Sequence, residues 1–210
     1  YQGHSILRFT TTPFPADALV IKRLIDVVGA SAGLLFLSPL MLLSAIFIKL
    51  EDPSAPVFFR QTRSGMYGKP FRMWKFRTMV ADAEALKADL EHQNEMSGAA
   101  FKIAHDPRIT RVGRYLRKSS IDELPQLLNV LVGEMSLVGP RPLIPREERG
   151  YERWQLRRLS VRPGITGLWQ VSGRNDVDFE TWMLLDMQYL DNWTVGLDIR
   201  LLLKTIPVVI

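Results

Sequence analysis

The 210-residue sequence contains no cysteine. This absence excludes a disulfide framework, a thiolate metal site and a cysteine nucleophile, and it fits a reducing compartment. Histidine is scarce as well: three scattered residues make a zinc site unexpected. Internal repeats are also lacking, which argues against a repeat architecture.

Basic residues exceed acidic ones, giving a net charge of +5 and a pI of about 9.6. This excess implies an anionic partner, which is a nucleic acid, an anionic membrane surface or a phosphorylated small molecule. The length and the 47% hydrophobic content are enough to bury a substantial core. We therefore expect one domain with at most one appended segment.

The chain begins at Tyr1 rather than Met, and prolines at 13 and 15 interrupt regular structure in its first twenty residues. We expect residues 1–20 to be a linker from a missing upstream region. Residues 21–50 are expected to form a membrane helix, and residues 51–210 a catalytic domain.

A long uncharged run extends from Val27 to Ile48, after Lys22-Arg23 and Asp26. About 22 residues at 1.5 Å each make a helix of about 33 Å, enough to cross a bilayer. The alternative is a helix buried in a soluble core. Such helices seldom run this far without a polar residue on one face, so the run favours a membrane segment.

Ser38 and Pro39 lie in the middle of this run. Pro39 cannot donate to the carbonyl of Leu35, so we expect a kink there, with the Ser38 hydroxyl bonding to a freed carbonyl. Basic residues at both ends of the run suit a hairpin that returns to one membrane face. Proline kinks also occur in spanning helices, so the residues alone leave both topologies open.

The stretch from Ser119 to Pro125 is the candidate centre of the chemistry. Ser120 and Glu123 have capping-box spacing, which predicts that a helix starts here and continues to Gly133. At a helix start the dipole favours ionised acids, so Asp122 is expected to be a carboxylate that holds a divalent metal or attacks phosphorus. The alternative is that Ser120 and Glu123 merely cap the helix.

Basic residues surround this stretch in the sequence. Lys75 belongs to a basic and aromatic run, and Arg117 closely precedes Asp122. Three loops rich in glycine and proline carry arginines and lie at 139–142, 162–167 and 172–174, the first with Arg141 and the last with Arg174. Arginines on rigid loops beside an acidic helix start are typical of metal-assisted phosphoryl transfer.

The C-terminal part, residues 179–210, places Trp182, Leu185, Tyr189 and Trp193 at helical spacing. Core packing explains most of this pattern. Tryptophan, tyrosine and lysine together also suit an amphipathic helix at the membrane interface.

Taken together, these motifs resemble those of the bacterial sugar transferases, the monotopic polyprenyl-phosphate phosphoglycosyl transferases. The matching residues extend from Lys22 to about Pro207 and comprise Lys22-Arg23-x-x-Asp26, Ser38-Pro39, Lys75-Phe76-Arg77-Thr78-Met79, Asp106-Pro107-Arg108, Arg117-x-x-Ser120-x-Asp122-Glu123, Gly139-Pro140-Arg141-Pro142, Arg162-Pro163-Gly164-Ile165-Thr166-Gly167 and Gly173-Arg174. No single motif decides the matter, but their number and order are highly specific.

The resemblance implies transfer of a phosphosugar from a UDP-sugar to undecaprenyl phosphate, with release of UMP, as the first membrane step of exopolysaccharide, capsule, O-antigen or glycoconjugate assembly. It implies Asp122 as nucleophile and Mg²⁺ ligand, with Glu123 as its catalytic partner. It also assigns substrate and phosphate binding to a set of residues that comprises Lys75, Arg117, Arg141, Arg174, Asp186 and Tyr189.

The resemblance further implies an α+β, predominantly helical fold. A re-entrant helix-hairpin, with Lys22, Arg23, Asp26, Ser38 and Pro39, would hold a cytosolic catalytic domain with interfacial amphipathic helices on the cytoplasmic face of the bacterial inner membrane. Membrane lipids are then partners, nucleic acid is not, and a homodimer stays open. The residues before Lys22 suggest a long-form member with upstream spanning helices.

Two other classes of protein are weighed against this one. A nucleic-acid-binding membrane protein would also be basic, but no helix-turn-helix or RNA-binding signature is present. A non-enzymatic membrane scaffold would keep the hairpin and the interfacial helices, yet it would tolerate the loss of Asp122.

Overall fold

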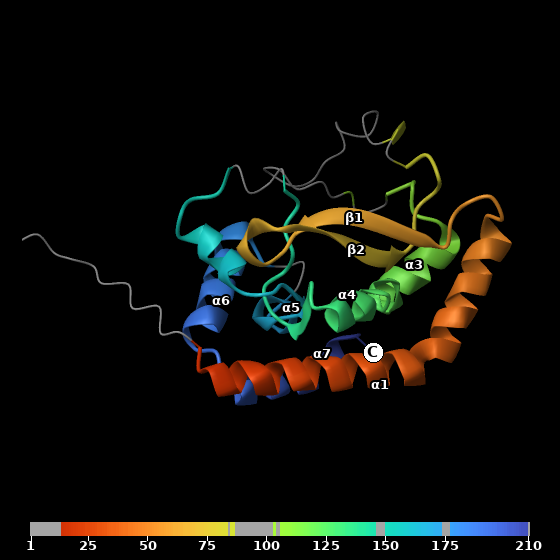
Figure 1. Cartoon of the computed structure of the whole chain (residues 1–210). Helices are drawn as coiled ribbons and strands as arrows, with labels where there is room; N and C mark the ends of the chain where they lie inside the picture. The colour runs from red at the N-terminus through yellow and green to blue at the C-terminus, as the bar shows by residue number, and fades with distance from the viewer. Residues whose placement is uncertain are drawn as a thin grey trace, which may run out of the picture.

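The computed structural model describes residues 14–83, 85–86, 103, 106–145, 150–173 and 177–209. The predicted linker therefore lies mostly outside the described residues. Figure 1 shows the elements, which in chain order are α1 (Ala16–Glu51), β1 (Phe58–Ser64), η1 (Met66–Gly68), β2 (Pro70–Phe76), α3 (Arg111–Lys118), η3 (Ile121–Glu123), α4 (Gln126–Val132), β3 (Ser136–Val138), η5 (Gln155–Ser160), β4 (Gly164–Thr166), α5 (Leu168–Val171), α6 (Phe179–Asp191) and α7 (Val195–Val209). The structure is 57% helical, which confirms the predominantly helical α+β prediction.

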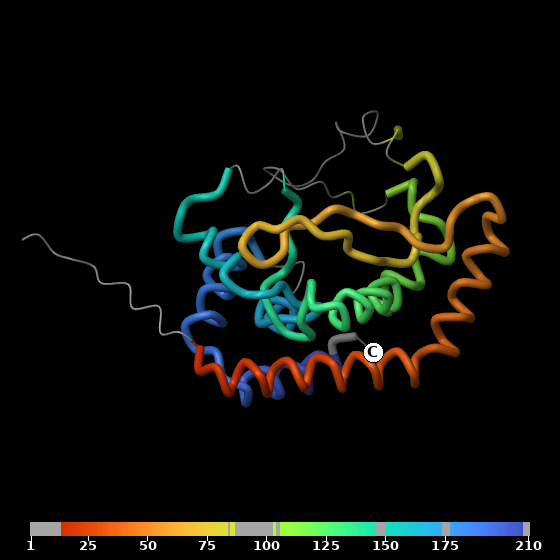
Figure 2. The backbone as a smooth tube through the Cα atoms, in the orientation of Figure 1, coloured from red at the N-terminus to blue at the C-terminus, as the bar shows by residue number. Residues whose placement is uncertain are grey.

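Helix α1 bends between two arms, and the bend is clear in the tube of Figure 2. Pro39 lies inside the helix, and the Ser38 hydroxyl donates to the carbonyl of Leu35 at 2.8 Å. This is the carbonyl that Pro39 leaves without its helical partner, so the predicted kink is confirmed. The two arms form one continuous bent helix, Ala16–Glu51, which begins five residues before the predicted start at residue 21.

Both arms of α1 pack against the same folded domain. In the first arm, Ala30 is fully buried against Leu127 and Val130 of α4. In the second arm, Ile48 packs with Phe76 of β2 and Leu116 of α3. Among the described residues, α1 is the helix long and apolar enough to cross a membrane. Its outer surface exposes many large apolar side chains, including Leu24, Val28, Leu35, Phe36, Leu43, Phe47 and Leu50.

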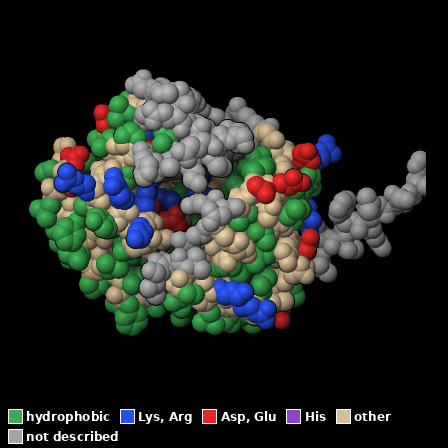
Figure 3. Space-filling view, turned by 180° about the vertical axis from the view of Figure 1, so that it is seen from behind, with side chains coloured by type: hydrophobic (Ala, Val, Ile, Leu, Met, Phe, Trp, Pro, Cys, Tyr) green, Lys and Arg blue, Asp and Glu red, His purple; other side chains and the backbone are tan. Residues whose placement is uncertain are grey.

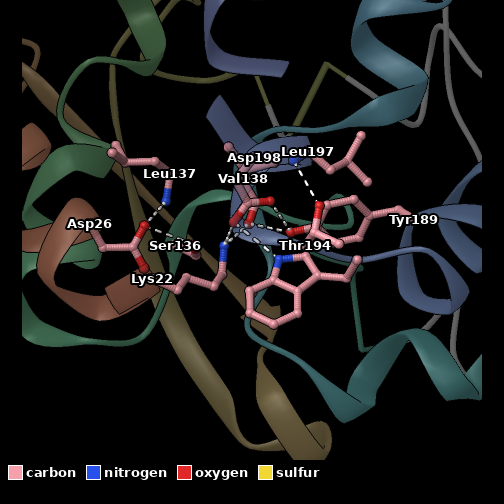
Figure 4. A network of polar contacts seen from close by, with 10 residues as sticks. Lys22, Asp26, Ser136, Leu137, Val138, Tyr189, Thr194, Leu197 and Asp198 are labelled. Carbon is pink, nitrogen blue, oxygen red and sulfur yellow. Dashed lines mark hydrogen bonds and ion pairs between the residues drawn. The ribbon is translucent and has the colours of Figure 1, made fainter. Parts of the chain in front are cut away.

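The charged residues near the start of α1 form polar contacts with other elements of the same chain. Figure 4 shows Lys22, whose Nζ donates to Asp198 at 2.5 Å and to the carbonyl of Val138 at 3.0 Å. In the same view the buried Asp26 accepts hydrogen bonds from the Ser136 hydroxyl and the Leu137 N–H. Lys22 and Asp26 therefore fasten the first arm to β3 and α7, whereas Lys22 was expected to act as a charge at the membrane face.

Two further contacts connect α1 to the helices on either side of η3. The Arg23 guanidinium donates to the carbonyls of Val130 and Leu131, at the C-terminal end of α4, at 2.7 Å each. The Glu51 carboxylate accepts from the N–H groups of Arg111 and Val112, at the start of α3. Each contact satisfies helix-end groups that lack a partner within their own helix.

The antiparallel hairpin of β1 and β2 lies over α4. Gly65 and the left-handed Gly68 form its turn, as their positions predicted. The fully buried Asn129 of α4 attaches to the open edge of β2, because its side chain accepts from the Trp74 N–H and donates to the Arg72 carbonyl. Lys75, the next residue of β2, is thereby held beside the end of η3.

Two of the predicted rigid loops pack directly against each other next to the parallel pair β3 and β4. The N–H of Gly164 donates to the carbonyl of Pro140 at 2.8 Å. A Cβ atom at Gly164 would lie only 2.1 Å from the nitrogen of Gly139. Glycine is therefore required at this contact, which fixes the backbone directly before Arg141.

Candidate functional site

The stretch that contains the two acids differs from the predicted helix start. Ser120 adopts a left-handed conformation with φ 55°, its side chain caps nothing, and α4 begins only at Gln126. The capping-box prediction is therefore wrong. The reason is tertiary: the Glu123 carboxylate binds the Lys75 ammonium at 2.6 Å. The predicted end of the helix is confirmed, since Gly133 closes α4 with φ 87°.

Asp122 is buried within η3, with 8% of its surface exposed. The carboxylate of Asp122 accepts a hydrogen bond from its own backbone N–H. No other residue within the described ranges donates to it. The charges of Lys75 and Arg117 act on it instead. The charge of Asp122 is therefore balanced by nearby cations rather than by hydrogen bonds from other described residues.

Burial raises the pKa of Asp122 from 3.8 to about 6, and the charge of Glu123 adds to the rise. Lys75 and Arg117 oppose it without cancelling it. The prediction that the helix start would favour the ionised form is thus wrong in direction, because burial outweighs the local dipole. A carboxyl group with this pKa is still about 90% ionised at pH 7, so the expected carboxylate is present.

Arg117 projects from the end of α3, and its Nε donates to the Thr78 hydroxyl at 2.9 Å. This bond occupies one donor and fixes the guanidinium, while its charge acts on Asp122. The motif acid Asp106 pairs with the buried Arg108 through two hydrogen bonds, so this pair is structural.

A small hollow opens beside the acids, and on the face seen in Figure 3 Lys and Arg side chains gather around acidic ones. Its lining brings together three predicted residues, Lys75, Glu123 and Arg141. The other lining residues are Arg63, Met73, Gln126, Pro142, Gly164, Ile165 and Gln170. The hollow is therefore a small, positively charged pocket that suits an anionic ligand, and the buried Asp122 is the neighbour of one of its lining residues.

Three polar residues of this lining, Arg63, Gln126 and Gln170, were not selected from the sequence. For Arg63 a signal existed. The hairpin register pairs Phe59 with Lys75, and side chains two and four residues apart on one strand share a face. Arg63 therefore lies on the same face of the hairpin as Lys75.

Comparison with known proteins identifies the family. The family described as "Bacterial sugar transferase" matches residues 17–210. The chain belongs to the bacterial sugar transferases. It is 45% identical to the galactosyl transferase CpsE of Streptococcus agalactiae over 213 residues, covering 100% of this chain and 46% of the relative.

Two further sugar-transferase relatives are similarly close. The exopolysaccharide production protein ExoY of Rhizobium meliloti is 45% identical, covering 90% of this chain and 84% of the relative. The undecaprenyl-phosphate galactose phosphotransferase of Salmonella typhimurium is 42% identical, covering 98% of this chain and 44% of the relative. The chain thus spans less than half the length of two of these relatives and most of the third.

Within this sugar transferase, five predicted site residues are not among the described residues that line the hollow. Asp122 directly precedes the lining residue Glu123, and Arg117 acts on Asp122 through its charge. The other three are Asp186, Tyr189 and Arg174. Asp186 is 1% exposed and forms an ion pair with the buried Arg158. The Tyr189 hydroxyl donates to Asp198 at 2.8 Å within the network of Figure 4. Arg174 lies outside the described residues. Asp186 and Tyr189 are therefore placed in the packing between elements, and direct contact with substrate is not supported for either.

A magnesium ion in this sugar transferase would find a limited set of protein ligands. Among the described residues there is no group of three or more His, Cys, Asp or Glu side chains that could hold a metal. Mg²⁺ is often bound by one or two carboxylates together with substrate phosphates. The Asp122 carboxylate fits that arrangement, because it accepts no hydrogen bond from another described residue.

Proposed function

We propose that this chain transfers a phosphosugar from a UDP-sugar to undecaprenyl phosphate, through a covalent intermediate on Asp122. The observation that carries the proposal is the buried Asp122 carboxylate, on which the charges of Lys75 and Arg117 act. Its neighbour Glu123 lines a hollow together with Arg63 and Arg141. Family membership and the Salmonella relative's name, which specifies undecaprenyl phosphate and a galactose phosphotransferase, support the reaction class.

In the first step, an Asp122 oxygen attacks the phosphorus that carries the sugar. The new bond joins Asp122 to this phosphorus, and the bond from phosphorus to the bridging oxygen breaks, so that UMP leaves with the bond's electron pair. The raised pKa suits this role, since a more basic carboxylate is a better nucleophile while it is still mostly ionised at neutral pH. Lys75 and Arg141 stabilise the charge on the phosphoryl oxygens.

In the second step, a phosphate oxygen of undecaprenyl phosphate attacks the same phosphorus. The bond to Asp122 breaks, the carboxylate is restored, and the product is a polyprenyl diphosphate sugar. Division into two steps means that the two anionic substrates need not meet directly. Glu123 holds Lys75 in place through their ion pair. Through Lys75 it also helps to bind the phosphate of the lipid.

Asp122 would hold Mg²⁺ together with the donor diphosphate. When bound, the ion supplies charge neutralisation to the diphosphate and to the departing UMP. The residues of the chain supply the orientation: Arg141 from its rigid loop, and Arg117 from its bond to Thr78.

We further propose that α1 enters the cytoplasmic leaflet of the bacterial inner membrane and returns to the same face. The support is that both of its arms pack on one domain while its bend exposes Leu35 and Phe36. Helix α7 also exposes apolar side chains, Ile199, Leu203 and Ile206, which suits a helix at the interface. The site would then lie close to the phosphate of a membrane-held acceptor.

The deciding experiment measures UMP release by the purified chain with undecaprenyl phosphate and a panel of UDP-sugars. We expect turnover with at least one donor, ping-pong kinetics, and exchange of UMP into UDP-sugar without lipid. Asp122→Asn should abolish all of these, because an amide is a poor nucleophile. Asp82→Asn, a change of an exposed acid, is the matched control.

Mass spectrometry of the donor-treated chain should find an added phosphosugar on Asp122. An adduct on another residue, or turnover that survives Asp122→Asn, would overturn the assigned mechanism. Failure of every donor with intact protein would instead favour the scaffold alternative.

A further inference from the structure

A buried cation lies behind Arg141, outside the hollow. Arg158 of η5 is 2% exposed, and its guanidinium contacts several elements at once. It forms an ion pair with Asp186 of α6 at 2.5 Å, and it lies 4.7 Å from the centre of the Trp182 ring. It also donates to the backbone carbonyl of Arg141 at 2.9 Å. The pair therefore connects α6 to the loop that carries Arg141.

The side chain of Arg141 is held by the same group of residues. Its guanidinium lies 5.1 Å from the centre of the Trp169 ring, and Trp169 packs against Trp182 at 5.5 Å between ring centres. Arg141 is thus supported twice, through its carbonyl by Arg158 and through its guanidinium by the tryptophan pair. Both supports rest on α6, far along the chain from η3.

A merely stabilising role does not account well for this pair. Burying two charges costs so much desolvation energy that apolar residues of similar size often stabilise a protein equally well. The cost is visible in Asp186, since burial raises its pKa to about 6 although Arg158 opposes the rise. What apolar residues could not supply is a donor for the Arg141 carbonyl.

We propose that Arg158 and Asp186 are positioning residues that aim Arg141 at the donor diphosphate. Neither is expected to touch the substrate. Asp186 orients the Arg158 guanidinium, Arg158 holds the backbone of Arg141, and the Trp169 ring limits where the Arg141 side chain can go. The inference rests on the proposed function, because it gives Arg141 a phosphate ligand.

The test replaces the whole pair, as Arg158→Met/Asp186→Leu, so that no lone charge is left buried. We expect a near-normal midpoint of thermal unfolding and a fall of about tenfold or more in kcat/KM for the UDP-sugar. Small displacements of a positioning group have effects of this size or larger. Because a ping-pong reaction has separate half-reactions, kcat/KM for undecaprenyl phosphate should not change.

The matched control is Arg157→Met/Asp191→Leu. Arg157 is next to Arg158 in the sequence, and Asp191 lies on α6 like Asp186. The separation of the control pair is similar, at 2.6 Å, but its side chains are 36% and 53% exposed. It should leave kcat/KM unchanged. If the buried double variant does not fold, Arg158→Lys keeps the charge but cannot bridge Asp186 and the Arg141 carbonyl together, and the same kinetic loss is expected.

The decisive comparison is made in an Arg141→Ala background. If the pair acts through Arg141, replacing it there should lower kcat/KM by less than about twofold, because the group it positions is already gone. An equal fall in both backgrounds would overturn the positioning role and leave the proposed function intact. Near-normal turnover of Arg141→Ala would overturn both the inference and the phosphate-binding role of Arg141. If the parent chain shows no turnover with any UDP-sugar, the proposed function itself is wrong.

Discussion

Replacing Asp122 by asparagine should stabilise the protein while abolishing its turnover. The ionised carboxylate is buried at a cost, as its pKa of about 6 against an ordinary 3.8 records. An amide has a similar shape and carries no charge, so it avoids this cost. We therefore expect the ionised Asp122 to lower the free energy of unfolding of the parent protein in exchange for a reactive carboxylate.

The magnitude follows from the pKa difference. A shift of about two units corresponds to about 3 kcal/mol between the ionised and the protonated forms in the folded state. Because the folded pKa is raised, the folded state binds more protons than the unfolded state between about pH 4 and pH 6. The stability of the parent therefore falls as the pH rises through this window, and it stays lowered above it.

At pH 7, Asp122→Asn should accordingly raise the free energy of unfolding by up to about 3 kcal/mol. For a chain of this length that corresponds to an increase of roughly 6 to 12 °C in the unfolding midpoint. The difference from the parent should shrink as the pH falls from 6 to 4. Thermal unfolding followed by tryptophan fluorescence across this range measures both quantities, with Asp82→Asn as control.

A variant that is destabilised or unchanged at pH 7 would refute this reasoning. It would mean that the Asp122 carboxylate is compensated by contacts stronger than the charges of Lys75 and Arg117. A gain in stability that is independent of pH would also contradict it, since such a gain could not come from titration of Asp122.

Two further predictions concern the acid limb of the pH–rate profile and the topology of α1. Lys75→Met should raise the pKa of Asp122 and move the acid limb of kcat/KM to higher pH, while Glu123→Gln should move it to lower pH; shifts in the same direction would contradict the assigned electrostatics. In the parent, single cysteines placed just before and just after α1 should label from the same side of the membrane. Ser38→Ala/Pro39→Leu should straighten α1, so that the same two cysteines label from opposite sides. Opposite-side labelling of the parent would rule out a re-entrant helix.

Features set by local chemistry could be predicted from the sequence. The bend of α1 follows from a proline and a serine hydroxyl within one helical turn, and Gly133 ends α4 because it readily takes positive φ. The rigid loop around Arg141 was likewise visible in its prolines and glycine. Each of these depends on residues within a few positions of one another.

The features that were missed depend on partners distant in the chain. Glu123 does not cap a helix because its partner, Lys75, comes from a strand 48 residues earlier. The bond from Lys22 to Asp198 spans 176 residues, so Lys22 could only be interpreted as a membrane-flanking charge. The direction of the Asp122 pKa shift needed its burial, which no local window contains.

The contacts of Arg23 and Glu51 have a practical consequence for handling this protein. Helix α1 binds the end of α4 and the start of α3, and Asp122 lies in the short segment between those two helices. A shortened chain that begins after Glu51, made to gain solubility, would uncover carbonyls of α4, N–H groups of α3 and the apolar surface that Ala30 and Ile48 cover. Detergents that loosen α1 should therefore lower activity before they unfold the domain. With α1 in the membrane as proposed, the bilayer would help to hold Asp122 in place.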